Sequence, residues 1–167
     1  MRDTHLLAED ERVELLDGEI YIMSPIGPFH VGIVNKLNRL LMIQIGSLGI
    51  VSIQNPVQLN DYSEPQPDLA ILSPRDDYYV EALARPEDIL LIIEIADSSL
   101  EYDRNEKLPR YAQAHISEVW IVDVSRHIVE QYTEPLQGEY RQLRKVLLGE
   151  IITATLLPIR LTTSDLF

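Results

Sequence analysis

The sequence contains no cysteine, and this absence excludes several kinds of chemistry at once. A disulfide framework, a zinc site with thiolate ligands and a cysteine nucleophile are all ruled out. Long apolar runs are absent too, because the longest is far shorter than the about 20 residues that cross a bilayer. Residues 1–5 are polar and are followed by acids, which does not fit a secretory signal. We therefore expect a cytoplasmic protein that does not associate with membranes.

Basic residues are scarce, with 14 Lys and Arg against 27 Asp and Glu and a net charge of −13. Proteins bind nucleic acids largely by neutralising phosphates with Lys and Arg. This balance therefore argues against tight binding to bulk duplex DNA. A local basic patch remains compatible with it, and the candidate members are Arg104, Lys107, Arg110, Arg141, Arg144 and Lys145.

The chain also lacks a glycine-rich phosphate loop, a Ser/His/Asp nucleophile signature, internal repeats and low-complexity segments. His5, His115 and His127 show no metal-ligand spacing, so no zinc site is predicted. A length of 167 residues with 46% hydrophobic residues suffices for a real core. No internal linker is visible, and we expect a single domain over residues 1–167.

Residues 13–23 are the clearest local unit, because Asp17-Gly18 separates two short apolar stretches and predicts a β-hairpin with a two-residue turn. In this register Leu16 pairs with Glu19. Val13, Leu15, Ile20 and Ile22 then share one apolar face. Glu14 lies on the other face, together with Leu16, Glu19 and Tyr21.

The rest of the chain predicts a mixed-sheet α/β domain. After a breaker cluster at residues 24–28, helical spacing predicts a helix that ends near Gly46. A second helix is expected to end around Ala114, and residues 73–87 are expected to be irregular. Strands or strand-like pieces are expected at 50–53, 56–59, 69–72, 89–95, 119–122, 128–132, 140–146 and 159–161.

Three ionisable groups stand out: Asp68, Glu94 and Lys107. Asp68 opens one continuous apolar stretch, and Glu94 comes near the end of another. Such runs are typical of strands covered on both faces, so both carboxylates are expected to be partly desolvated. A buried carboxylate is costly unless it is paired, hydrogen-bonded or bound to a metal. The pattern suggests a divalent-cation site for phosphodiester chemistry.

Mg²⁺ (or Mn²⁺) suits this pattern, because Mg²⁺ prefers oxygen ligands and is usually held by one or two carboxylates. Asp68 and Glu94 are the expected ligands if their strands are neighbours, and the Ile95 carbonyl is a third. Lys107 is the expected positive partner, orienting the attacking water or screening the developing charge.

At this point the chain resembles a known family. Residues 14–20 (ELLDGEI), the later Met23-Ser24-Pro25, and His30 resemble the opening of the Uma2 family, formerly a domain of unknown function. The resemblance continues in family order over residues 10–135. It includes Pro67-Asp68-Leu69-Ala70, Glu94-Ile95, Tyr102-Asp103-Arg104, Glu106-Lys107, Tyr111-Ala112 and the stretch 118–123.

That family is placed in the PD-(D/E)XK restriction-endonuclease-like superfamily. The resemblance therefore implies a mixed central sheet flanked by helices and a Mg²⁺-dependent nuclease centre. It assigns Asp68, Glu94, Lys107 and Glu14 to that centre, with Glu14 as a helper. It also implies a nucleic-acid substrate, with DNA favoured over RNA, and a homodimer by analogy with the superfamily.

The chain departs from the superfamily pattern at Ala96 and from the family pattern at Asp97, and Pro109 restricts where the following helix can begin. Ala96 stands where a lysine is usual, so Lys107 would have to reach the acids from the following helix. Asp97 replaces an expected serine and either binds a second cation or caps the helix. Pro109 would break a hydrogen bond deep inside a helix, so the helix must begin near Lys107 or be kinked there.

Each candidate also has a purely structural interpretation. Asp68 would be a strand-entry residue bonded to nearby backbone, and Glu94 would form a salt bridge, with Lys107 as its partner. Lys107 would form a surface i,i+4 pair with Asp103. Glu14 would be a solvated strand residue, and His30 a hydrogen-bonded histidine at the core edge.

Two classes of function therefore compete. One is a Mg²⁺-dependent endonuclease, which the three ionisable groups favour. The other is a catalytically silent adaptor with the same fold that binds a basic protein through its acidic surface, which the net charge favours. A site for a small nucleotide is a third alternative, and it would remove the conflict with the net charge.

Overall fold

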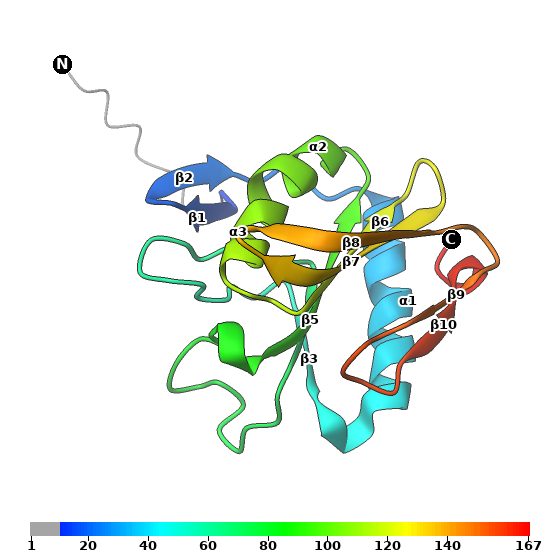
Figure 1. Cartoon of the computed structure of the whole chain (residues 1–167), viewed down its shortest axis with the longest axis horizontal. Helices are drawn as coiled ribbons and strands as arrows, with labels where there is room; N and C mark the ends of the chain where they lie inside the picture. Colours follow the sequence, from blue (N-terminus) through cyan, green and yellow to red (C-terminus); the bar gives the residue numbers. More distant parts are fainter. Residues whose placement is uncertain (1–10) are drawn as a thin grey trace.

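A six-stranded mixed β-sheet forms the centre of the computed structural model, which describes residues 11–167 (Figure 1). The strand order is β3-β4-β5-β6-β7-β8; β5 and β6 run parallel, and the other neighbouring pairs run antiparallel. The predicted α/β class with a mixed sheet is confirmed. The strands are β3 (Ile50–Ile53), β4 (Leu69–Leu72), β5 (Ile89–Ala96), β6 (Glu118–Asp123), β7 (Ile128–Leu136) and β8 (Glu139–Val146).

One face of the sheet is covered by α1 (Pro28–Ile45), which matches the predicted helix closely. Leu37 and Leu41 of α1 pack in one buried cluster with Leu69 and Ile93 of the central strands. Full burial of each such side chain contributes about 1.5–3 kcal/mol. In Figure 1 the C-terminal hairpin of β9 and β10 lies on the same side of the sheet as α1.

The opposite face is covered by α3 (Leu108–Gln113). Tyr111 and Ala112 of this helix pack in a second buried cluster with Ile92 and Ile121. Because layers cover both faces, the central strands consist of nearly continuous apolar residues, as the sequence indicated.

The helical segment between β5 and β6 contains a π-helical turn (Asp103–Lys107), preceded by α2 (Leu100–Tyr102). The Leu108 N–H bonds to the Asp103 carbonyl, five residues back, as a π-helical turn requires. Pro109 then falls in the first turn of α3, where a missing N–H is tolerated. The conflict raised by this proline is resolved, because α3 begins directly after Lys107.

The N-terminal hairpin of β1 (Val13–Leu16) and β2 (Glu19–Ile22) is confirmed, with Leu16 paired to Glu19. Asp17 and Gly18 both have positive φ, 51° and 82°, as its two-residue turn requires.

The predicted inward face of this hairpin is wrong. Ile20 and Ile22 are 58% and 65% exposed, whereas Glu14 and Leu16 are buried. The hairpin docks on the chain near Glu64, whose backbone exchanges hydrogen bonds with that of Leu15. Glu14 has polar partners at this contact, and these partners reduce the free-energy cost of burying its carboxylate.

Two expectations about strands need correction. Residues 56–59 form no strand; Val57 and Leu59 instead bond within their own loop, to the Pro65 and Ser63 carbonyls. At the C-terminus, β10 (Arg160–Thr162) pairs with β9 (Ile151–Thr153), a strand that the sequence pattern did not predict.

No helix in the described part of the chain combines the length and hydropathy of a membrane span.

Candidate active site

The register of the sheet brings Asp68 and Glu94 to the same end of two neighbouring strands. Leu69 of β4 pairs with Ile93 of β5, so the next positions outward, Asp68 and Glu94, lie opposite each other. A pocket of about 240 Å³ opens at this end of the sheet. Side chains of the N-terminal hairpin, the first turn of α1, the loop after β5 and the π-helical turn line it.

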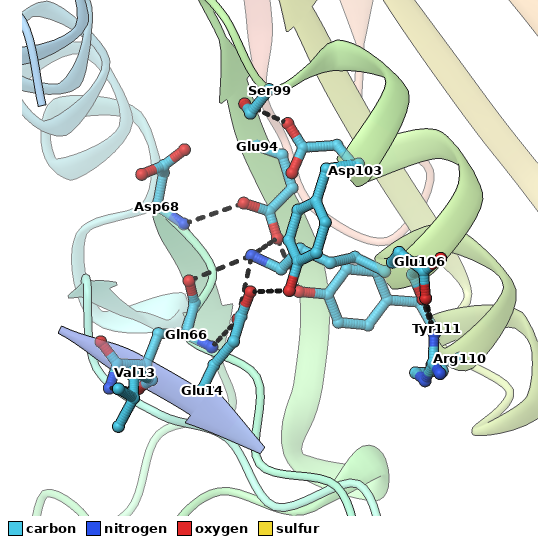
Figure 2. Close-up of polar contacts among 12 residues, drawn as sticks. Val13, Glu14, Gln66, Asp68, Glu94, Ser99, Asp103, Glu106, Arg110 and Tyr111 are labelled. Carbon is cyan, nitrogen blue, oxygen red and sulfur yellow. Dashed lines mark hydrogen bonds and ion pairs between the residues drawn. The ribbon is translucent and has the colours of Figure 1, made fainter. Parts of the chain in front are cut away.

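The Glu94 carboxylate is buried and is bonded unequally at its two oxygens (Figure 2). Its Oε1 accepts a hydrogen bond from the Tyr111 hydroxyl at 2.6 Å and contacts the Lys107 Nζ at 2.8 Å. Within residues 11–167, its Oε2 accepts only the longer bond from the Asp68 N–H, at 3.3 Å. Burial raises the pKa of Glu94 above its ordinary value, and the charge of Lys107 opposes this rise.

Lys107 is 2% exposed and reaches the carboxylates from the π-helical turn. Besides Glu94, its Nζ donates to the Gln66 carbonyl at 3.2 Å and lies 3.5 Å from the Glu14 Oε2. Burial alone would lower the pKa of Lys107, but the carboxylates of Glu94, Glu14 and Asp103 outweigh it and raise the pKa. Lys107 is therefore a buried cation, and its interpretation as half of a surface pair with Asp103 is wrong.

The Asp68 carboxylate is held from two sides. Its Oδ1 lies 2.9 Å from the His30 Nε2 of α1, and its Oδ2 accepts a 2.8 Å bond from the Ile95 N–H. Figure 2 shows the Asp68 N–H, rather than its carboxylate, facing Glu94. His30 is buried, and within residues 11–167 its Nδ1 has no hydrogen-bond partner.

Glu14 enters the site because the hairpin turns it inward. Its Oε1 accepts from the Tyr102 hydroxyl at 2.6 Å, and its Oε2 accepts from the Gln66 N–H at 3.0 Å. The solvated interpretation of Glu14 is therefore wrong. Glu14 fixes the Gln66 backbone, and the Gln66 carbonyl in turn accepts from Lys107.

Four residues of this network were not predicted as site residues: Gln66, Tyr102, Asp103 and Tyr111. The sequence could have indicated Tyr111, because it follows Lys107 by four residues and lies on the same helix face. Asp103 accepts from the Ser99 hydroxyl at 2.7 Å, and burial raises its pKa from 3.8 to about 6. Gln66 contributes through its backbone, which leaves no signal in the residue type.

The site carries more negative than positive charge. Glu14, Asp68, Glu94 and Asp103 lie around it, and Lys107 is the cation in their midst. Asp97 is exposed on the same pocket. Within residues 11–167, no group of three or more His, Asp or Glu side chains is arranged to hold a metal ion.

The candidate basic patch does not assemble here. Arg104 forms a salt bridge with Glu130, and Arg110 pairs with Asp17 and Glu106. Arg141, Arg144 and Lys145 lie on β8 and do not line the pocket. Of the six candidates, Lys107 alone lines it.

Comparison with known proteins identifies the family. A family model named Uma2 and described as "Putative restriction endonuclease" matches residues 2–164, nearly the whole chain. The chain belongs to the Uma2 family. The resemblance found in the sequence is thereby confirmed. No curated protein matches this Uma2 chain.

A solved structure shares the fold of this Uma2 chain. It is a crystal structure of "a putative nuclease belonging to DUF820" from Anabaena variabilis ATCC 29413. The TM-score is 0.73, the sequence identity is 16%, and the match covers 97% of this chain and 93% of that one. At this identity the likeness establishes a shared nuclease-like fold, with its mixed sheet and flanking helices.

Proposed function

We propose that this Uma2 protein is a Mg²⁺-dependent endonuclease of the PD-(D/E)XK type that hydrolyses phosphodiester bonds. The observation that carries the proposal is the Lys107 ammonium, 2.8 Å from Glu94 at a pocket that Asp68 also lines. We propose DNA ahead of RNA as the substrate, because the family description names a restriction endonuclease.

Asp68, Glu94 and the Ile95 carbonyl are the residues that would hold Mg²⁺ or Mn²⁺. The Ile95 N–H faces Asp68, and in a strand the N–H and C=O of one residue point to the same side, so this carbonyl also lies on the Asp68 side. Oxygen donors and surplus carboxylate charge suit a hard divalent cation, which needs only one or two carboxylates. When bound, the ion would supply charge neutralisation at the phosphoryl oxygens and an activated water.

The protein's own groups would then perform distinct tasks. Lys107 holds a fixed positive charge beside the pocket, where it stabilises negative charge that develops on the phosphoryl group. Glu14 helps by holding the Gln66 carbonyl against the Lys107 ammonium. His30 orients Asp68 through the contact between Nε2 and Oδ1.

Arg12 is the other cationic side chain on the pocket wall. Within residues 11–167 its guanidinium has no hydrogen-bond or ion-pair partner, in contrast to Arg104 and Arg110. We assign Arg12 to a substrate phosphate next to the cleaved bond, since planar guanidinium groups pair well with phosphates. One such contact provides local affinity that the net charge of −13 does not provide over the whole surface.

The second candidate is the catalytically silent adaptor that binds a basic protein. The net charge of −13 and the pairing of Arg104 and Arg110 with acids favour it. In such an adaptor the ion pair of Lys107 and Glu94 would be structural, and the pocket would bind no divalent cation.

Cleavage assays distinguish these functions. Single- and double-stranded DNA and RNA are incubated with Mg²⁺ or Mn²⁺ and wild type, Asp68→Ala, Glu94→Ala or Glu130→Gln. Glu130 is a matched control, because it is a buried glutamate with a basic partner away from the pocket. Metal-dependent cleavage by wild type and Glu130→Gln, with at least about 100-fold loss in the other two, is the expected result. Absence of cleavage above the Glu94→Ala level, together with absence of metal binding, would favour the adaptor.

A further inference from the structure

Tyr111 is a fully buried residue of α3 whose hydroxyl touches the candidate metal centre. The hydroxyl donates to the Glu94 Oε1 at 2.6 Å, and the same oxygen contacts the Lys107 Nζ at 2.8 Å. The phenol is the donor in this contact, and both donors meet at one oxygen of Glu94.

This arrangement makes the two oxygens of Glu94 unequal. A carboxylate oxygen has two lone pairs, and both lone pairs of Oε1 have a donor. Among the described residues, Oε2 has only the 3.3 Å bond from the Asp68 N–H, which leaves one of its lone pairs without a donor. Oε2 is thus the oxygen available to a cation.

We infer that Tyr111 is a positioning residue that holds Glu94 with Oε2 directed to the divalent cation. This inference rests on the proposed function, because it concerns the same metal centre. Tyr111 is thereby added to the residues of the proposed centre, in which Asp68, Glu94, Lys107 and Glu14 already have roles.

Lys107 alone would restrict the orientation of the Glu94 carboxylate less than Lys107 and Tyr111 do together. Its ammonium is a rotatable donor shared among Glu94, Glu14 and the Gln66 carbonyl, and it can pair with either carboxylate oxygen. The Tyr111 ring is instead packed in the buried cluster of the α3 face, so its hydroxyl has one direction. A rigid partner of a metal-binding carboxylate typically changes metal affinity by about 10- to 100-fold.

Mn²⁺ binding to the full chain tests this inference without reference to catalysis. The dissociation constant is measured by electron paramagnetic resonance for wild type, Tyr111→Phe, Tyr140→Phe and Glu94→Gln. Tyr140 is the matched control, because its half-buried hydroxyl donates to the Ile116 carbonyl at 2.7 Å and does not touch the site. We expect about 10- to 100-fold weaker binding in Tyr111→Phe, wild-type affinity in Tyr140→Phe and loss of binding in Glu94→Gln.

The outcomes separate the two proposals. Equal affinity in Tyr111→Phe and wild type, with binding lost in Glu94→Gln, would overturn the role of Tyr111 and leave the metal centre intact. No binding in wild type would overturn both. The rise in melting temperature on adding Mn²⁺ is a second measurement, which remains valid if Tyr111→Phe is less stable; a reduced rise in that variant supports the inference, and an unchanged rise contradicts it.

Discussion

Among single residues, the buried Lys107 is the one on which the site depends most. It is the charged partner of Glu94 and lies near Glu14, and both of these carboxylates are also buried. Removing one partner of a buried ion pair leaves the other charge without compensation, which is far more costly than losing a surface pair. The same contact therefore contributes to both stability and the proposed chemistry.

Replacing Lys107 by Met tests that dependence. We expect Lys107→Met to lower the free energy of unfolding by about 3–5 kcal/mol and to abolish cleavage. Urea unfolding monitored by circular dichroism provides the measurement, with Lys145→Met on the exposed part of β8 as the control. Equal loss of stability in both variants would show that Lys107 is not a compensating charge.

Asp103 predicts a pH dependence of stability. Burial raises its pKa from 3.8 to about 6, so its ionised form costs free energy in the folded state at pH above 6. This cost declines as the pH falls through 6 and vanishes below the unfolded value. Asp103→Asn should therefore be more stable than wild type at pH 8, by up to about 3 kcal/mol, with little difference near pH 4. Melting temperatures at the two pH values measure this, and an equal difference at both would refute it.

Among the elements, the strands were more predictable than the parts that dock against them. The positions of Asp68 and Glu94 at the ends of central strands were predictable, because continuous apolar stretches identify such strands and an acid at the end of one is conspicuous. Whether the Lys107 side chain contacts these carboxylates could not be predicted, because this contact depends on a π-helical turn ahead of Pro109. Pro109 indicated that the helix begins near Lys107 or is kinked there, but it did not specify a π-helical turn.

The N-terminal hairpin shows why its inward face was also unpredictable. Apolar periodicity favours the Ile20 side, but the docked side is the one on which Glu14 finds Tyr102, Gln66 and Lys107. These partners come from distant parts of the chain. Apolar periodicity counts only apolar residues, so it cannot predict the burial of an acid that has three polar partners.

Paired truncations test which face of the hairpin is buried. Leu16→Ala should lower the free energy of unfolding by about 2–5 kcal/mol, because Leu16 is fully buried. Ile20→Ala should change it by less than about 0.5 kcal/mol, since this side chain is mostly exposed. Chemical denaturation of both variants gives the comparison. The reverse order would mean that the hairpin packs by its apolar face.

For the molecule as a whole, charge is the property most at odds with a nuclease. A net charge of −13 opposes binding to polyanions, and Arg104 and Arg110 are paired with acids. Affinity for nucleic acid should therefore depend on a few contacts at the pocket, with Arg12 among them. The predicted homodimer stays a prediction, to be tested by analytical ultracentrifugation.

Salt dependence of DNA binding measures how many phosphates are contacted. We expect a shallow slope of log affinity against log salt for wild type, and a slope smaller by about 1 in Arg12→Ala. Arg39→Ala is the control, because Arg39 is exposed on α1 and does not line the pocket. Fluorescence anisotropy with Ca²⁺ in place of Mg²⁺ gives the affinities. An equal slope in wild type and Arg12→Ala would remove Arg12 from the substrate site.

The central claim is that Asp68, Glu94 and the Ile95 carbonyl hold a divalent cation beside Lys107. Anomalous diffraction from crystals soaked in Mn²⁺ tests it most directly. We predict an anomalous peak within about 2.0–2.3 Å of oxygens of Asp68, Glu94 and Ile95, and no peak in crystals of Glu94→Gln. A soaked wild-type crystal without a peak at this pocket, or with the same peak in Glu94→Gln, would contradict it.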